Sequence, residues 1–346
     1  MKNIVRHTVF WPVVALVALL LVNTIARPTF AKIVIQNGQL YGTPIEILRN
    51  SAPLMLVALG MTIVIATRGI DLSVGAMMAV SGSVALTIID SSPTPEAPGV
   101  IALAIGAGVL ATLLFGTWNG FLVSVLGIQP IIATLVLMLA GRGIALLITG
   151  GFITTVNSAP YKFISQGYVL GFPFAFFVSI LAVTVVVLIQ RKTALGMLTE
   201  AVGINPEASR LAGVRSRGII WGAYAASGVL AGFAGILYSS NIMAADANAA
   251  GNLIELDAIL AVVLGGTSLM GGKFSIAGTV IGVFTIQTLR STIVFLGVPP
   301  PVSPVFLAGV VIVVVAVRSQ LVRQTAARWF RAIRSTVRPL NSKVTS

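Results

Sequence analysis

One stretch of the chain decides its fold class: Pro130-Ile-Ile-Ala-Thr-Leu-Val-Leu-Met-Leu-Ala-Gly-Arg-Gly-Ile-Ala-Leu-Leu-Ile-Thr149. Its single charged residue is Arg142, and a helix of about 20 apolar residues crosses the roughly 30 Å of hydrocarbon in a bilayer. Similar runs recur along the chain, and about ten of them predict membrane-spanning helices. They cover residues 9–26, 53–67, 72–89, 100–126, 130–149, 172–190, 218–238, 256–272, 274–296 and 302–317.

The composition of the whole chain agrees with this interpretation. Apolar residues make up 57% of the 346 residues, charged residues only 9%, and the mean hydropathy is +1.02. Soluble domains carry about 25% charged residues, so this much apolar surface needs lipid as its solvent. We therefore expect an all-α, polytopic membrane protein, with a transmembrane domain over residues 1–317 and a basic tail over residues 318–346.

The distribution of Lys and Arg between the loops predicts the orientation, because basic residues are enriched on the cytoplasmic side of a membrane. With an even number of spans, the basic N-terminus, the segment 191–217, the junction at Lys273 and the tail all lie on one side. The loops 90–99 and 239–255 contain acidic residues and no basic residue, as external loops should. Both termini are therefore predicted to be cytoplasmic. The loop 27–52, with three basic residues, is the exception.

The net charge of +13 at pH 7 has a simple origin. Its basic residues lie mainly in the predicted cytoplasmic loops and in the tail, beside the anionic lipid of the inner leaflet. We therefore expect membrane lipid, and no nucleic acid, as the partner of this charge.

One long polar segment interrupts the apolar pattern: Glu200-Ala-Val-Gly-Ile-Asn-Pro-Glu-Ala-Ser-Arg-Leu-Ala-Gly213. Basic residues stand before and after it, which places it on the predicted cytoplasmic side. A short amphipathic segment there is what a partner protein could bind, and we interpret it as the place where an ATPase acts on a transporter. The residues expected to serve this contact are Glu200, Gly203, Asn205, Glu207, Arg210 and Gly213.

Residue types that most enzymes need are scarce. The chain has no cysteine and a single histidine, which excludes disulfides, thiol catalysis and cysteine-ligated metals. The loop Gly265–Lys273 fails as a phosphate-binding loop, because Thr267 and Phe274 stand at two positions that such a loop gives to other residues. We expect a non-catalytic subunit without metal or cofactor, so any ATP must be bound by another subunit.

Two glycine-rich stretches, Gly69–Gly75 and Gly265–Gly272, interrupt apolar runs and share three residues when shifted onto each other. Paired broken helices are typical of the binding region of transporters, because their free backbone groups need a cavity or buried protein around them. The alternative is a tight cytoplasmic turn between two helices. If the stretches line a pathway, the polar residues that they contribute are Asp71, Ser73, Thr267 and Ser268.

Ionisable residues inside predicted spans are costly and are therefore candidates for function. Asp71 either pairs with Arg68 or faces the pathway. Arg142 either snorkels to the external interface or lines the pathway, whereas Arg290 is expected only to snorkel.

Other pathway candidates are neutral or lie at the ends of spans. Trp118 and Asn119 stand inside one span, where a packed tryptophan beside a satisfied amide is the alternative. An acidic and amide cluster lies at the external end of two spans, and it suits a sugar, an external partner or plain solvation. Its members are Asp246, Asn248, Asn252, Glu255 and Asp257.

Several motifs together establish a family resemblance. They are Gly69-Ile-Asp-Leu-Ser-Val-Gly75, Trp118-Asn-Gly120, Gly203-Ile-Asn205, Arg210-Leu-Ala-Gly213, Leu256-Asp-Ala258, Gly265-Gly-Thr-Ser268 and Gly271-Gly272. In this order they resemble the ribose-type permeases of bacterial ABC sugar importers over nearly the whole chain. Within that family the sequence is most similar to galactofuranose importer permeases. That similarity rests on Ile65-Ala-Thr67, Gly141-Arg-Gly143, Lys192-Thr-Ala-Leu-Gly-Met197, Glu200-Ala-Val-Gly-Ile-Asn205, Ala245-Asp-Ala-Asn248 and Glu255-Leu-Asp-Ala-Ile-Leu-Ala261.

The resemblance implies a transport subunit of the bacterial inner membrane. Its implied partners are a second permease, identical or paralogous, an ABC ATPase that acts through residues 200–213, and a periplasmic sugar-binding protein. Ala249, Pro206 and Glu207 depart from the family's pattern and leave the sugar and the choice of partner open. A permease for ribose, xylose or an autoinducer is the alternative within the class. An ion-coupled secondary transporter, with Asp71 as its titrating carboxyl group, is the alternative outside it.

Overall fold

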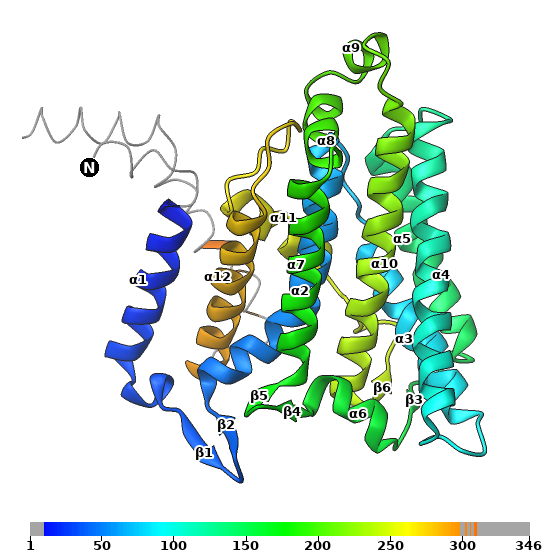
Figure 1. The fold of residues 1–346 in the computed structure, drawn as a ribbon. Helices are drawn as coiled ribbons and strands as arrows, with labels where there is room; N and C mark the ends of the chain where they lie inside the picture. Colours follow the sequence, from blue (N-terminus) through cyan, green and yellow to red (C-terminus); the bar gives the residue numbers. More distant parts are fainter. Residues whose placement is uncertain (1–9, 298–301, 303–304, 306–307, 310–346) are drawn as a thin grey trace, which may run out of the picture. The chain divides into compact units, whose positions relative to one another are not determined.

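Helices form almost all of the regular structure (Figure 1). The structure is a computed structural model that describes residues 10–297, 302, 305 and 308–309. The chain divides into two compact units, residues 1–292 and 293–346. The predicted tail 318–346 lies outside the described residues, as does most of the predicted span 302–317.

The helices confirm a polytopic, mostly helical protein. Six of the described helices, α2, α4, α5, α7, α10 and α12, are long and apolar enough to cross a membrane, and α1, α3 and α8 are shorter apolar helices. The predicted number of spans stays a prediction. The bounds are α1 Phe10–Ala26, α2 Thr43–Ala66, α3 Val74–Asp90, α4 Pro98–Ser124, α5 Pro130–Ile148, α6 Ala159–Gln166, α7 Phe174–Lys192, α8 Leu195–Ile204, α9 Pro206–Leu211, α10 Ser216–Ile242, α11 Ile254–Leu264 and α12 Ile276–Phe295, with a 3-10 turn at Pro28–Ala31.

Three short antiparallel strand pairs were not predicted. One of them turns at Asn37-Gly38, with φ angles of 51° and 74°, and Asn-Gly is the strongest short-range hairpin signal in a sequence. The pairs are β1 (Val34–Gln36) with β2 (Gln39–Tyr41), β3 (Thr154–Thr155) with β6 (Ala244–Ala245), and β4 (Tyr168–Val169) with β5 (Phe172–Pro173).

The structure corrects the expected bounds of two helices. α2 begins at Thr43 and has 24 residues, so Glu46 and Arg49 of the expected loop 27–52 lie within a helix. The window of apolar residues stops at these charges, whereas the helix continues through them. α11 has only 11 residues and is much shorter than the predicted span 256–272.

Small residues let the helices of the bundle approach one another closely. A Cβ atom built on Gly228 of α10 would lie 3.0 Å from the Cα atom of Gly116 in α4. The buried face of α4 also contains Gly108 and Thr112. Helices in lipid pack through small residues of this kind, and we expect the opposite face of α4 to contact lipid. Its outward apolar side chains, with exposed fractions of 55–62%, are Leu103, Leu110 and Leu114.

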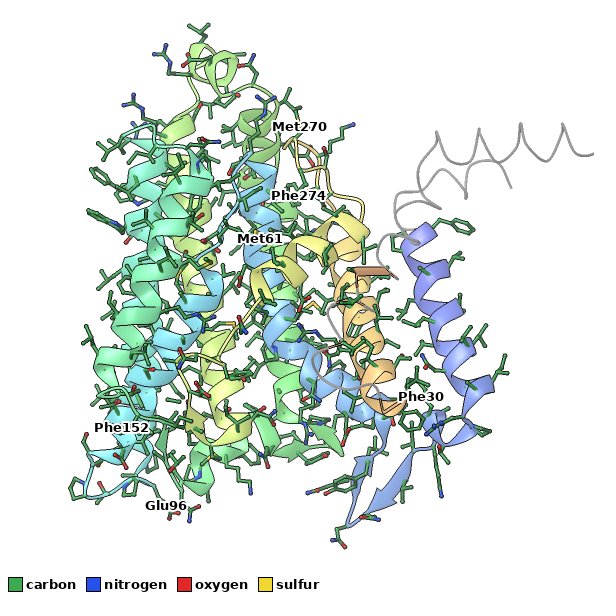
Figure 2. The ribbon with its side chains drawn as sticks, turned by 180° about the vertical axis from the view of Figure 1, so that it is seen from behind. Phe30, Met61, Glu96, Phe152, Met270 and Phe274 are labelled. Atoms are coloured by element: carbon green, nitrogen blue, oxygen red, sulfur yellow. The ribbon has the colours of Figure 1, made fainter. Side chains whose placement is uncertain are left out.

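The two ends of the bundle differ in character. One end is formed by α8, α9 and the loop 265–275, and we call it the basic end because the basic residues of the segment 191–217 and Lys273 belong to it. The six strands and α6 lie at the opposite end, which we call the strand end (Figure 1). Figure 2 shows Met270 at the basic end, and Glu96 and Phe152 at the strand end. This separation agrees with the charge pattern from which the orientation is predicted.

Candidate functional site

Two short helices begin at buried residues in the interior of the bundle. α3 follows the non-helical segment 67–73, and α11 follows the non-helical segment 243–253. The starts of the two helices touch. A Cβ atom built on Gly251 would lie 2.7 Å from the carbonyl oxygen of Gly75, and one built on Gly75 would lie 2.7 Å from Oε2 of Glu255. We call this contact the half-helix junction and define it by Gly75, Gly251 and Glu255.

A buried polar cluster holds the segment before α3. Oδ1 of Asp71 accepts hydrogen bonds from the backbone N–H of Ser73 at 3.1 Å and from its hydroxyl at 2.6 Å. Oδ2 accepts from the hydroxyl of Ser227 in α10 at 2.8 Å. The amide of Asn119 in α4 donates to Oγ of Ser73 at 2.9 Å. The cluster therefore joins the non-helical segment 67–73, which we call the first break, to α4 and α10, and all four residues are at most 1% exposed.

The sequence identified three members of this cluster and missed the fourth. Ser227 lies among small residues of α10 and carries no signal that separates it from other serines of the helix. Trp118, the neighbour of Asn119, lies apart from the cluster. It is 55% exposed, and its ring centroid is 6.1 Å from that of Phe121.

Arg68 does not pair with Asp71, which corrects one of the expected alternatives. Its Nε donates to the carbonyl oxygen of Met270 at 3.1 Å, and its Nη2 donates to that of Ile204 at 2.5 Å. The guanidinium thus points to the basic end, where its charge stays in contact with water. Through these bonds Arg68 joins the first break to α8 and to the loop 265–275.

Arg142 of α5 holds the non-helical segment 243–253, which we call the second break. Its Nη1 donates to the carbonyl oxygens of Ala247 and Ala250 at 2.6 Å each, and to that of Asn248 at 3.3 Å. The carboxylate of Asp246 accepts hydrogen bonds from the backbone N–H groups of Asn248 and the next residue. Backbone without helical hydrogen bonds needs such partners inside a membrane protein. Arg142 therefore binds the second break. The sequence had left two alternatives for this side chain, snorkelling to the external interface and lining the pathway.

The segment 239–255 is not the solvated external loop that its charges predicted. α10 continues to Ile242, β6 pairs with β3 at the strand end, and the chain then returns into the bundle as far as Gly251. The side chains of Glu255 and Asp257 are consequently buried, with residue exposures of 7% and 3%. The acidic cluster is thus divided between a surface turn and the interior.

Asp257 has a specific partner in α12. Its carboxylate forms an ion pair with the guanidinium of Arg290, whose side chain is 46% exposed. This corrects the expectation that Arg290 only snorkels. A buried carboxylate without such a partner would be strongly destabilising, and the sequence gives no sign that two residues of different helices meet here.

The second glycine-rich stretch is a surface loop between α11 and α12. Oγ1 of Thr267 accepts a hydrogen bond from the backbone N–H of Ser275, and Oγ of Ser268 accepts one from that of Met270, both at 3.2 Å. Met270 itself is 78% exposed. Gly265–Gly272 is therefore a turn between two helices, whereas Gly69–Gly75 is a break in the interior of the bundle.

The polar segment of the sequence forms two helices, α8 and α9, at the basic end. Asn205 separates them, and its Oδ1 accepts a hydrogen bond from the backbone N–H of Ala208 at 3.0 Å, which caps α9. Gly203 faces the interior, where a Cβ atom would meet the backbone of Ala66 and lie 2.5 Å from the nitrogen of Gly272. α8 therefore rests directly on the end of α2 and on the loop 265–275.

The outer surface of this pair is accessible. Arg210 and Glu207 form an ion pair of 3.1 Å between side chains that are 65% and 75% exposed. Leu211 is 83% exposed, and Gly213, with a φ of +86°, ends the pair. Glu200 is half-buried in α8. A partner protein would meet both charged and apolar side chains here.

Comparison with known proteins identifies the relatives of the chain. Residues 43–315 match the family described as branched-chain amino acid transport system / permease component. The galactofuranose transporter permease of Escherichia coli K12 is 47% identical over 317 residues, which cover 90% of this chain and 91% of the relative. The fructose import permease of Bifidobacterium longum is 41% identical over 95% of this chain and 93% of its own.

The ribose import permease of Bacillus subtilis is a more distant relative, with 36% identity over 83% of this chain and 85% of its own length. No solved structure matches the chain. The relatives are thus similar to this chain over most of its length, including both half-helices and the α8–α9 pair.

Proposed function

We propose a function from one premise: the chain belongs to the family of permease components of the branched-chain amino acid transport system. It is the membrane-spanning permease subunit of an ABC sugar importer, and galactofuranose is the sugar that we assign to it. The observation that carries the assignment is the 47% identity to the galactofuranose permease over 90% of the chain. The fructose and ribose relatives support the wider class of sugars.

The substrate assignment is tested with the complete transporter. This chain is reconstituted in proteoliposomes with its ATPase and its sugar-binding protein, and ATP-dependent uptake of labelled galactofuranose, fructose, ribose and leucine is compared. We expect galactofuranose uptake to exceed that of the other three. A transporter that accumulated leucine and no sugar would overturn the assignment.

The α8–α9 pair is where we place the ATPase partner. It lies at the basic end, its outer side chains are exposed, and Gly203 seats α8 on the end of α2 without an intervening side chain. A force on α8 would therefore reach Arg68, which donates to Ile204, and the first break. The assembly is completed by a second permease, identical or paralogous, and by the periplasmic sugar-binding protein at the strand end.

We expect Arg210→Glu to reduce ATP-driven uptake at least about fivefold while the amount of folded protein is unchanged. The exposed pair with Glu207 contributes about 0–1 kcal/mol to stability, so its loss cannot unfold the bundle. Uptake and copurification of the ATPase are the measurements. Lys32→Glu, a reversal at an exposed residue of the strand end, is the control for copurification of the ATPase. Full uptake by Arg210→Glu and Glu200→Lys together would remove α8–α9 from the ATPase contact.

The orientation is tested with two cysteine variants, because the natural chain has no cysteine. Phe152 at the strand end is 81% exposed and Leu211 at the basic end is 83% exposed, so the two positions are matched. In intact spheroplasts we expect an impermeant maleimide to label Phe152→Cys, and to label Leu211→Cys only after lysis. The reverse pattern would place the strand end on the cytoplasmic side and the basic end on the external side of the inner membrane.

A further inference from the structure

A polar cavity of about 270 Å³ lies in the half of the bundle nearer the strand end. It is enclosed by α2, α6, α10, α12 and the segment 249–254. Cavities that hold small molecules start at about 300 Å³, so this one suits a molecule no larger than a monosaccharide. The polar side chains in its wall include Arg49, Asn50, Tyr238, Asn241, Asn252 and Gln287.

The backbone is irregular on two sides of the cavity. Pro53 lies inside α2 and lines the cavity, and because proline has no N–H, the carbonyl group of Arg49 lacks its helical donor. Gly251 and its neighbours, on the other side, belong to the non-helical segment before α11. Non-helical backbone at membrane depth is tolerated where it is buried in protein or lines a hydrated cavity. Two such breaks that face one cavity indicate a site built for a polar occupant.

The polar side chains of the wall have unused hydrogen-bonding capacity. Gln287 is only 9% exposed, and among the described residues neither its amide nor that of Asn50 has a hydrogen-bond partner. Nε of Arg49 is buried and also has no partner in the described part of the chain. Buried polar groups are nearly always satisfied, so Nε of Arg49 requires an occupant or water, and the amides of Asn50 and Gln287 are free to bind the same occupant.

The chemistry of the wall fits a neutral polyol. Amides donate and accept, as each sugar hydroxyl does, and the phenol of Tyr238 adds a third group of this kind. Arg290 also lines the cavity, but its charge is already balanced by Asp257. Among the residues that the structure describes, no carboxylate lines the cavity, so the wall lacks the negative charge that would balance an ammonium group.

Arg49 also lines a second hollow, a surface depression of about 480 Å³ at the strand end. Two tyrosines of this depression, Tyr41 and Tyr168, have ring centroids 5.3 Å apart. Phe163, Lys162 and Gln166 complete a wall of aromatic and hydrogen-bonding groups. Arg49 is therefore the boundary between the surface and the interior cavity.

We propose that the cavity holds one monosaccharide during import, and that the sugar reaches it from the strand-end depression past Arg49. This inference rests on the proposed function, which makes the strand end the external side. It assigns a sugar-contact role to Asn50, Tyr238 and Gln287, and a gating position to Arg49.

The test uses the complete reconstituted transporter and replaces two cavity amides by the apolar side chain of similar size. We expect Asn50→Leu and Gln287→Leu each to lower kcat/KM for galactofuranose uptake about fivefold, the effect of one lost hydrogen bond. Basal ATP hydrolysis and folded yield stay unchanged. Gln129→Leu is the matched control, because Gln129 is exposed at the start of α5, outside both hollows.

A second measurement does not depend on transport. The single-cysteine variant Gln287→Cys is treated with N-ethylmaleimide in detergent, with galactose, fructose or leucine present at equal concentration. We expect the sugars to slow labelling several-fold and leucine to have no effect. This variant decides the matter if a leucine substitution lowers the folded yield.

The outcomes separate the two proposals. Wild-type protein that imports sugar, beside cavity variants with unchanged kcat/KM and no sugar protection of Gln287→Cys, would overturn the cavity assignment alone. Wild-type protein that imports no sugar would overturn the proposed function, and the cavity assignment with it.

Discussion

Gly75→Leu is expected to remove nearly all folded, transport-competent protein. A Cβ atom at this position meets the carbonyl oxygen of Gly251 and lies 2.7 Å from Oε2 of Glu255. The first obstacle is backbone and cannot rotate away, so α3 and α11 must separate. Overpacking of a fitted interior costs about 1–3 kcal/mol and sometimes more, and this contact joins the starts of two half-helices. We expect at least about tenfold less monodisperse protein than from the natural chain by size-exclusion chromatography. The yield of Gly75→Ala should fall between those of Gly75→Leu and the natural chain.

The control for this variant is Gly106→Leu in α4. A Cβ atom on Gly106 has no neighbour within 4 Å, so the same increase in side-chain volume should leave yield and uptake unchanged. If Gly75→Leu purified normally and imported sugar at the rate of the natural protein, the half-helix junction would not exist in the working transporter.

The half-helix junction also shows where sequence patterns stop being informative. The apolar windows located α4, α5, α7 and α10 well, because lipid-facing residues impose a length and a composition on each helix. They failed at α11, whose sequence merges with the loop that follows it. Nothing in the local pattern of Gly251 indicates that it meets Gly75, because contact between two distant backbones leaves no side-chain signature.

The polar candidates illustrate the same limit. The cost of burying charge marked Asp71 and Arg142 as residues that need a reason to be where they are. The reasons lie in their partners, which are Ser73 and Ser227 for Asp71 and backbone carbonyl groups for Arg142. A sequence names the groups that require partners, and only the packing of the helices decides which groups meet.

The acidic cluster misled for a related reason. Loops at the ends of spans are normally solvated, so the charges of the segment 239–255 predict an external loop. In the structure the segment returns into the bundle, and its carbonyl groups are held by Arg142. The cavity beside it was not predicted at all, because Asn50 and Gln287 are ordinary isolated amides in the sequence.

Asp71 discriminates between an ABC permease and an ion-coupled carrier, and its substitution is expected to have the second-largest effect. Asp71→Leu removes three hydrogen bonds and leaves the hydroxyl of Ser227 without its acceptor at a site with 0% exposure. Hydrogen bonds to a charged acceptor contribute about 1.5–3 kcal/mol each. We therefore expect little folded protein from Asp71→Leu, measured by size-exclusion chromatography of the solubilised membrane.

Asp71→Asn is the informative partner of that variant. The amide oxygen can still accept both hydrogen bonds from Ser73, and the hydroxyl of Ser227 can turn to accept a hydrogen bond from the amide N–H. If the carboxyl group serves only to hold the segment before α3, Asp71→Asn should fold and import sugar at close to the natural rate, with ATP as the only energy source. A protonophore should then leave uptake by proteoliposomes unchanged.

A carrier that moves protons through this carboxyl group has the opposite behaviour, because an amide cannot titrate. Asp71→Asn would fold and yet accumulate no sugar, and a protonophore would abolish uptake by the natural protein. That pair of results would replace the ABC permease by an ion-coupled carrier, whereas survival of Asp71→Asn makes the carboxyl group a structural link between α3, α4 and α10.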